Sequence, residues 1–150
     1  PVSAAPKPSV CDAASRDEIV TKCVCTPCRV AVVGASPKAE RPVFGVMEYL
    51  KGEGFTLFPV NPAYAGTEIH GAACVSSLGD IASPVDVVAL FLSAKMQSAF
   101  HEELKTLPDK PVVWFQPGAE NEELERSLAE AGYDVVSGEC LMALRKGCCR

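Results

Sequence analysis

The feature that most constrains the fold of this chain is a regular alternation of short apolar runs with longer amphipathic segments. Each run is dominated by aliphatic and aromatic residues and is bounded by polar residues, glycine or proline. Runs of this kind are typical of strands that are buried on both faces of a parallel sheet. The five runs are Val30–Val33, Phe55–Val60, Asp86–Leu92, Val112–Phe115 and Val135–Val136.

The segments between these runs carry apolar residues at helical spacing. A helix is expected to open at Arg41–Pro42, because proline is tolerated at the first helical position. The expected inward residues are Val43, Val46, Met47 and Leu50 in this helix, Met96, Phe100, Leu104 and Leu107 in the next, and Leu124, Leu128 and Ala131 in the helix Asn121–Ala131. The alternation predicts an α/β protein: a Rossmann-like, doubly wound sheet of about five mainly parallel strands with helices on both faces.

Length and composition limit the classes that remain. The 150 residues fit one domain, and 48% apolar residues argue against a disordered chain. The net charge of −5 argues against non-specific nucleic-acid binding, and no apolar run is long enough to span a membrane. No secretory signal is recognised, so we expect a cytoplasmic protein; the leader has few acidic residues, which leaves an organelle as the alternative. The predicted parts are a flexible, cysteine-containing extension with a short helix through Ile19 and Val20 (1–28), the sheet domain (29–146) and a tail (147–150).

Eight cysteines are more than a core of this size needs, and six of them lie near the chain ends. The spacing Cys23-x-Cys25-x-x-Cys28 resembles part of a zinc knuckle, and Cys11 could add a fourth ligand. No second C-x-x-C pair follows at finger spacing, so we predict no metal and an inert or redox-sensitive extension. A redox or metal module remains the hypothesis that assigns a role to the terminal cysteines: Cys11, Cys23, Cys25, Cys28, Cys148 and Cys149.

In an open parallel sheet, ligands bind beyond the carboxyl ends of the strands. The first strand is followed there by Gly34 and Ser36, and a glycine lets the backbone come close to a ligand. Lys38 and Arg41 supply cations near a helix start, which is the chemistry expected around phosphates. A nicotinamide dinucleotide is disfavoured, because G-x-G-x-x-G is absent and no acidic residue ends the second strand.

From about Arg29 to Lys146 the chain resembles the single-domain CoA-binding proteins, relatives of the CoA-binding domain of the succinyl-CoA synthetase alpha subunit. The matching segments occur in the order expected for that family. They are 32–36 (VVGAS), 41–42 (RP), 49–50 (YL), 59–62 (PVNP), 66–71 (GTEIHG), 77–81 (SLGDI), 84–88 (PVDVV) and 114–118 (WFQPG).

The resemblance implies that the ligand is CoA or an acyl-CoA, a small nucleotide thiol or thioester. By position, the phosphates would face Gly34, Ala35, Ser36, Lys38 and Arg41. The adenosine part would be flanked by Val60, Asn61 and Pro62, and the path of the pantetheine arm would be lined by Phe91, Ser93, Gln116, Pro117 and Gly118.

No nucleophile, base and orienting group form a recognisable set, and only His70 and Cys140 could be proposed as reactive side chains. We therefore predict no catalytic residue and a non-catalytic carrier, sensor or accessory subunit that works alone, as a homo-oligomer or beside a partner enzyme. The alternatives are a component of an acyl-CoA ligase and a dinucleotide-dependent oxidoreductase.

Overall fold

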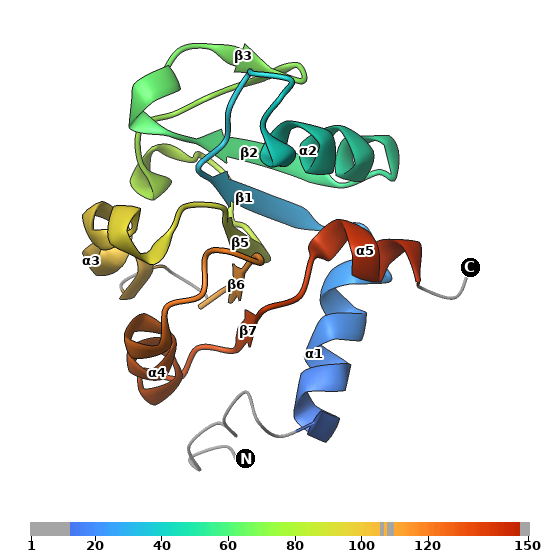
Figure 1. The fold of residues 1–150 in the computed structure, drawn as a ribbon, viewed down its shortest axis with the longest axis vertical. Coiled ribbons are helices and arrows are strands. Elements are labelled where there is room, and N and C mark those ends of the chain that lie inside the picture. Colours follow the sequence, from blue (N-terminus) through green and yellow to red (C-terminus); the bar gives the residue numbers. More distant parts are fainter. Residues whose placement is uncertain (1–12, 106, 108–109, 148–150) are drawn as a thin grey trace.

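The computed structural model of the protein describes residues 13–105, 107 and 110–147 (Figure 1). Its centre is a sheet of five strands in the order β2-β1-β5-β6-β7, and every neighbouring pair is parallel. The strands are β1 (Arg29–Val33), β2 (Thr56–Val60), β5 (Val87–Leu90), β6 (Val112–Phe115) and β7 (Val135–Ser137). The predicted parallel sheet is confirmed, and each strand lies within or beside its apolar run.

Helices cover both faces of this sheet, as a doubly wound fold requires (Figure 1). One face packs against α1 (Ala13–Val24), α2 (Pro42–Gly52) and α5 (Leu141–Lys146), and the other packs against α3 (His101–Lys105) and α4 (Glu122–Glu130). Strand residues alternate between the two cores: Val30 and Val32 point into the first, and Ala31 and Val33 into the second. The four residues expected inward on α2 are all buried.

The helix expected after the third strand is wrong in part. The segment begins as two short 3₁₀ turns, η3 (Ala94–Met96) and η4 (Ser98–Phe100), and only then becomes α3. Met96, expected to face the core, is 61% exposed, because the neighbouring Gln97 is the residue that is fully buried. Ala131 is also exposed, since α4 ends at Glu130 and Ala131 lies past its last turn.

Two further segments complete the unit. Beyond β2 the chain forms the turn η1 (Pro62–Tyr64), the small hairpin β3 (Glu68–Ile69) and β4 (Ala72–Ala73), and the turn η2 (Leu78–Asp80). The predicted helix in the extension is present as α1, whose end is packed: Cys23 and Val24 are buried, and Arg145 of α5 donates a hydrogen bond to the Val24 carbonyl. The domain boundaries themselves stay predictions. None of the helices among the described residues could cross a membrane.

Candidate ligand-binding site

The strand order places a topological switch between β1 and β5. From β1 the chain crosses to β2 on one side of the sheet, whereas β5, β6 and β7 follow one another on the other side (Figure 1). The loops that leave β1 and β5 therefore diverge, and a crevice at the carboxyl edge between them is the usual ligand position in such sheets.

Gly34 lies at the start of the loop that joins β1 to α2. Its φ of 95° is unfavourable for any residue with a side chain, and its amide donates a 2.9 Å hydrogen bond to the Val60 carbonyl. A Cβ atom at this position would lie 3.1 Å from Cδ2 of Leu92, the second residue after β5. Glycine is therefore required both by the turn and by the close approach of Leu92 across the switch point.

The next two residues, Ala35 and Ser36, are buried, at 0% and 5% exposure. No residue in the described parts of the chain accepts a hydrogen bond from the amide of either one. Buried amides without a partner are rare in folded proteins, because their desolvation is not compensated. Two of them side by side form a pair of donors that suits an anion, provided that the loop opens enough to admit it.

Positive charge stands next to these amides. Lys38 and Arg41 are exposed, and Arg41 is the N-cap residue of α2, whose positive end it adjoins. The Ser36 hydroxyl accepts a 3.1 Å hydrogen bond from the Lys38 amide and thereby shapes the turn between them. This half of the carboxyl edge is suited to phosphate groups.

Asn61 connects this loop to β2. Its Nδ2 donates to the Ala35 carbonyl at 2.8 Å, and its Oδ1 accepts from the Ala63 amide at 2.9 Å, which caps η1. Both functions of the side chain are therefore used within the protein. Val60 is fully buried, whereas Pro62 is exposed beside the loop.

The loops after β5 and β6 form the other wall. Ser93, Pro117 and Gly118 are exposed and Phe91 is half-buried, but Gln116 is buried and its Oε1 accepts a 2.8 Å hydrogen bond from the Leu141 amide at the start of α5. The predicted residues thus gather at one edge of the sheet in two groups. Gly34, Lys38, Arg41, Pro62, Phe91, Ser93, Pro117 and Gly118 are accessible, while Ala35, Ser36, Val60 and Gln116 are buried beneath them and Asn61 is half-buried.

Sequence reasoning missed the residue that joins these two loops. Gln97 donates from Nε2 to the carbonyls of Leu92 (2.8 Å) and Ala119 (2.6 Å), and its Oε1 accepts from Nδ2 of Asn121 (3.0 Å). A buried glutamine has no sequence signature of its own. Asn121 was recognisable, because an asparagine directly before an amphipathic segment is a typical N-cap, and it does cap α4.

The β6 and β7 half of the edge is acidic. Glu120 accepts a hydrogen bond from the Gly118 amide, and Glu125 accepts from the Asn121 amide and the Ser137 hydroxyl. Glu122 and Glu123 occupy the first turn of α4 and complement the positive end of that helix. A polyanion would therefore be repelled from this half and attracted to the loop that carries Lys38 and Arg41.

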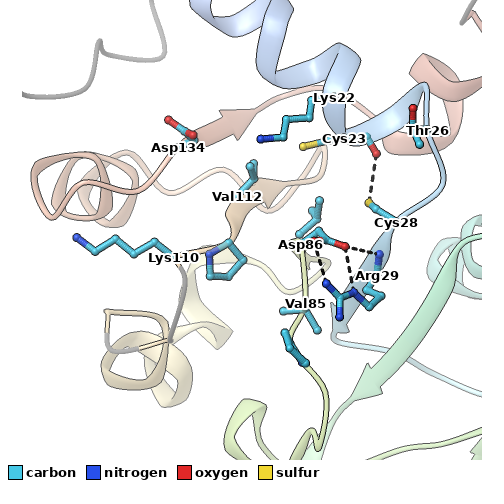
Figure 2. Close-up of a pocket in the computed structure, with 13 residues that line it drawn as sticks. Lys22, Cys23, Thr26, Cys28, Arg29, Val85, Asp86, Lys110, Val112 and Asp134 are labelled. Atoms are coloured by element: carbon cyan, nitrogen blue, oxygen red, sulfur yellow. Dashed lines mark hydrogen bonds and ion pairs between the residues drawn. The ribbon is translucent and has the colours of Figure 1, made fainter. Parts of the chain in front are cut away.

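The cysteine motif lies at the opposite, amino edge of the sheet, beside the pocket shown in Figure 2. Burial raises the pKa of the Cys23 thiol to about 12 and that of Cys28 to about 11, and the Cys28 thiol donates to the Cys23 carbonyl. Cys25 is disulfide-bonded, so it is not a free thiolate ligand. Among the described residues, no three histidine, cysteine or acidic side chains are placed to hold a metal ion. Cys11, Cys148 and Cys149 lie outside the described residues.

His70 and Cys140, the two side chains that could be proposed as reactive, come from different elements of the fold. Nε2 of His70, in the turn between β3 and β4, lies 3.0 Å from the Phe44 carbonyl oxygen, and the two rings are 4.2 Å apart. Cys140 is a half-buried free thiol that packs against the α1, α2 and α5 side of the core. The absence of catalytic residues stays a prediction.

Comparison with known proteins identifies related chains. The sequence profile of the CoA binding domain matches residues 28–146. The uncharacterized protein YneT of Bacillus subtilis (strain 168) is 37% identical over 114 residues, covering 75% of this chain and 82% of that protein. The ADP-forming acetate–CoA ligase I of Archaeoglobus fulgidus is 32% identical over 121 residues, covering 75% of this chain but 17% of the ligase. A hypothetical protein from Pyrococcus horikoshii OT3 has a similar structure, with a TM-score of 0.76, 36% identity and 89% coverage of each chain.

Proposed function

Because this chain belongs to the CoA binding domain family, we propose that it binds CoA or an acyl-CoA without catalysing a reaction on the ligand. The proposal rests above all on the buried amides of Ala35 and Ser36, which have no partner among the described residues and lie beside two exposed cations. A diphosphate is the part of CoA that such a loop would hold, since it offers several acceptor oxygens and negative charge.

Each half of the edge has a distinct role in this proposal. Gly34, Ala35 and Ser36 supply backbone donors to the phosphates, and Lys38 and Arg41 supply charge. Asn61 and Val60 hold the loop from below, and Pro62 flanks the adenosine part. The pantetheine arm follows the uncharged wall formed by Phe91, Ser93, Pro117 and Gly118, with the buried Gln116 supporting it.

A binding protein of this kind would carry, sequester or sense the thiol or thioester, alone, as a homo-oligomer or beside a partner enzyme. No step of chemistry is assigned to His70, because its ring nitrogen is already in contact with the Phe44 carbonyl. The four residues along the pantetheine path are uncharged, and the acidic Glu120 lies beside Gly118. This wall suits an arm that contains amides and a thiol rather than a second nucleotide with its own phosphate.

Isothermal titration calorimetry with CoA, acetyl-CoA, dephospho-CoA and NAD tests the proposal. We expect binding of CoA and acetyl-CoA, and weaker or undetectable binding of NAD. The double variant Lys38→Glu/Arg41→Glu should weaken CoA binding by about a hundredfold, because two attractive contacts of 0.3–1 kcal/mol each become repulsive.

The matched control is Lys105→Glu/Arg126→Glu, which makes the same change in net charge on exposed residues of α3 and α4. It should leave CoA affinity within about threefold of the parent, with measurements at two salt concentrations to reveal general electrostatic effects. Equal loss in both double variants, or NAD binding without CoA binding, would show the proposed site to be wrong.

A role as a component of an acyl-CoA ligase is the second candidate, supported by the similarity to part of the acetate–CoA ligase of Archaeoglobus fulgidus. The present chain matches 17% of that enzyme. Incubation with acetate, ATP and CoA, with and without the remaining domains of such a ligase, distinguishes the two. A binding protein leaves acetyl-CoA at background in both incubations, whereas a ligase component supports the formation of acetyl-CoA and ADP once the remaining domains are added.

A further inference from the structure

A second cavity lies at the amino edge of the sheet, across the strands from the loop discussed above. It encloses about 570 Å³, within the range of small-molecule pockets, and opens between the end of α1 and the starts of β1, β5 and β6 (Figure 2). Its floor is apolar, formed by Val85, Val87 and Val112 together with two prolines. No part of the proposed CoA function uses it.

Only some of the polar side chains around this cavity form hydrogen bonds or ion pairs with one another. Arg29 and Asp86 form an ion pair (Nε to Oδ2, 3.3 Å), and the same Oδ2 accepts from the Arg29 amide at 2.9 Å. Lys110 donates to the Ala131 carbonyl at 2.6 Å. Lys22 is exposed and makes no hydrogen bond or ion pair within the described residues, and Figure 2 shows its side chain extending from α1 towards Val112.

The lining therefore has a net positive charge, with three basic side chains against the carboxylates of Asp86 and Asp134. The ion pair neutralises Arg29 and Asp86 mutually. The two cysteines of the lining, Cys23 and Cys28, remain uncharged thiols and behave as part of the apolar wall. A single anionic group beside Lys22 is the charge that this end of the cavity can accept.

A smaller apolar slot of about 150 Å³ adjoins the cavity. The two share Pro84, Val85 and Pro111, so a cavity with charged side chains and an apolar slot lie next to each other. The residues that line the slot beyond the shared ones are mainly aliphatic: Leu78, Ile81 and Leu107, with Gly79 and Ser83. This arrangement matches a ligand with a charged head and an apolar chain.

We propose that the amino edge is a second ligand site, which takes a monoanionic amphiphile such as a medium-chain carboxylate. The carboxylate pairs with the Lys22 ammonium, and the alkyl chain lies along Val85 and Pro111 into the slot lined by Ile81. This inference is independent of the proposed CoA function, because the two sites lie at opposite edges of the sheet.

Calorimetric titration of the whole chain with octanoate, butyrate and octylammonium tests the proposal, each in the absence and presence of saturating CoA. Each fully buried methylene strengthens binding about fourfold, so octanoate should bind about tenfold or more tightly than butyrate even if its chain is half buried. Octylammonium should bind more weakly than octanoate, and CoA should displace neither. Displacement of octanoate by CoA, equal affinity for the two head groups, or no binding of octanoate would overturn the assignment.

Two variants locate the site. Lys22→Glu should weaken octanoate binding about tenfold, whereas the matched variant Lys105→Glu should not change it. Ile81→Asn should abolish the preference for octanoate over butyrate, and its melting temperature shows whether the fold is retained. If Ile81→Asn does not fold, the Lys22 and Lys105 variants decide by themselves: equal octanoate affinity in the two refutes the site.

Discussion

Asn61 offers the sharpest test of how the loop between β1 and α2, the proposed phosphate-binding loop, is held in place. Its side chain makes two hydrogen bonds, to the Ala35 carbonyl and from the Ala63 amide, and each contributes about 1 kcal/mol net. Asn61→Ala should therefore lower the free energy of unfolding by about 2 kcal/mol, which corresponds to a fall of about 4–8 °C in melting temperature for a chain of this size. Since Ala35 is also freed, CoA affinity should fall about tenfold.

Asn61→Ser separates the two bonds, because serine can still cap η1 but is too short to reach the Ala35 carbonyl. We expect it to regain about half of the lost stability and none of the lost affinity, measured by urea unfolding and by calorimetric titration with CoA. Arg145→Met is the control, since it removes bonds to Glu53 and the Val24 carbonyl far from the loop. It should lower stability without changing affinity. Asn61 variants that lose stability but bind CoA as tightly as the parent would refute a positioning role.

Three further predictions concern Gly34, Gln97 and Cys28. Gly34→Ala should lower the free energy of unfolding by about 1–3 kcal/mol, because Gly34 has a φ of 95° and an added Cβ would crowd Leu92. Adding Leu92→Ala to this variant should recover part of the loss, as measured by urea titration. Gln97→Leu should cost about 3 kcal/mol, because it leaves buried carbonyls without donors; a cost below 1 kcal/mol would contradict the network. Burial raises the pKa of Cys28 from 9.0 to about 11, so its alkylation by iodoacetamide at pH 8 should be about a hundredfold slower in the folded chain than in urea. The unfolded chain releases this proton first, so the contribution of Cys28 to stability should be lost as the pH rises from about 9 to about 11.

Most of the fold could be predicted because its strongest signals are local. Runs such as Val30–Val33 are buried on both faces, and Val43, Val46, Met47 and Leu50 follow the period of a helix that faces the core. The segment around Met96 was misassigned for a reason that lies outside it. Its apolar spacing suits a helix, but the partners that bury Gln97 come from the loops after β5 and β6.

The sequence predicted which edge of the sheet carries the candidate site, but not which side chains are exposed on it. Position after a strand indicates which residues lie near the ligand, but it does not indicate which way a side chain points. Gln116 follows β6 as expected, yet it turns inward to the amide of Leu141 in α5, a helix that the sequence pattern did not reveal. The cavity at the amino edge could not be predicted for a related reason, because Lys22, Asp86 and Pro111 converge only after the sheet has formed.

The loops of the carboxyl edge are all held by side-chain carboxamides. Asn61, Gln97, Gln116 and Asn121 each use a side-chain carboxamide to join backbone segments from different elements or to cap a helical turn. A carboxamide can both donate and accept, so it fixes a loop without bringing charge to it. Carboxylates in the same positions would repel a diphosphate. In the loop after β1 the exposed Glu40 stands between Lys38 and Arg41, so this loop carries two basic side chains against one acidic one. In the β6 and β7 half, Glu120 and Glu125 accept from local donors. Neutral connections near β1 leave the net positive charge of Lys38, Glu40 and Arg41 in place, whereas the connections near β6 and β7 are acidic. In the proposed binding mode, this difference would orient a ligand with an anionic end and an uncharged arm.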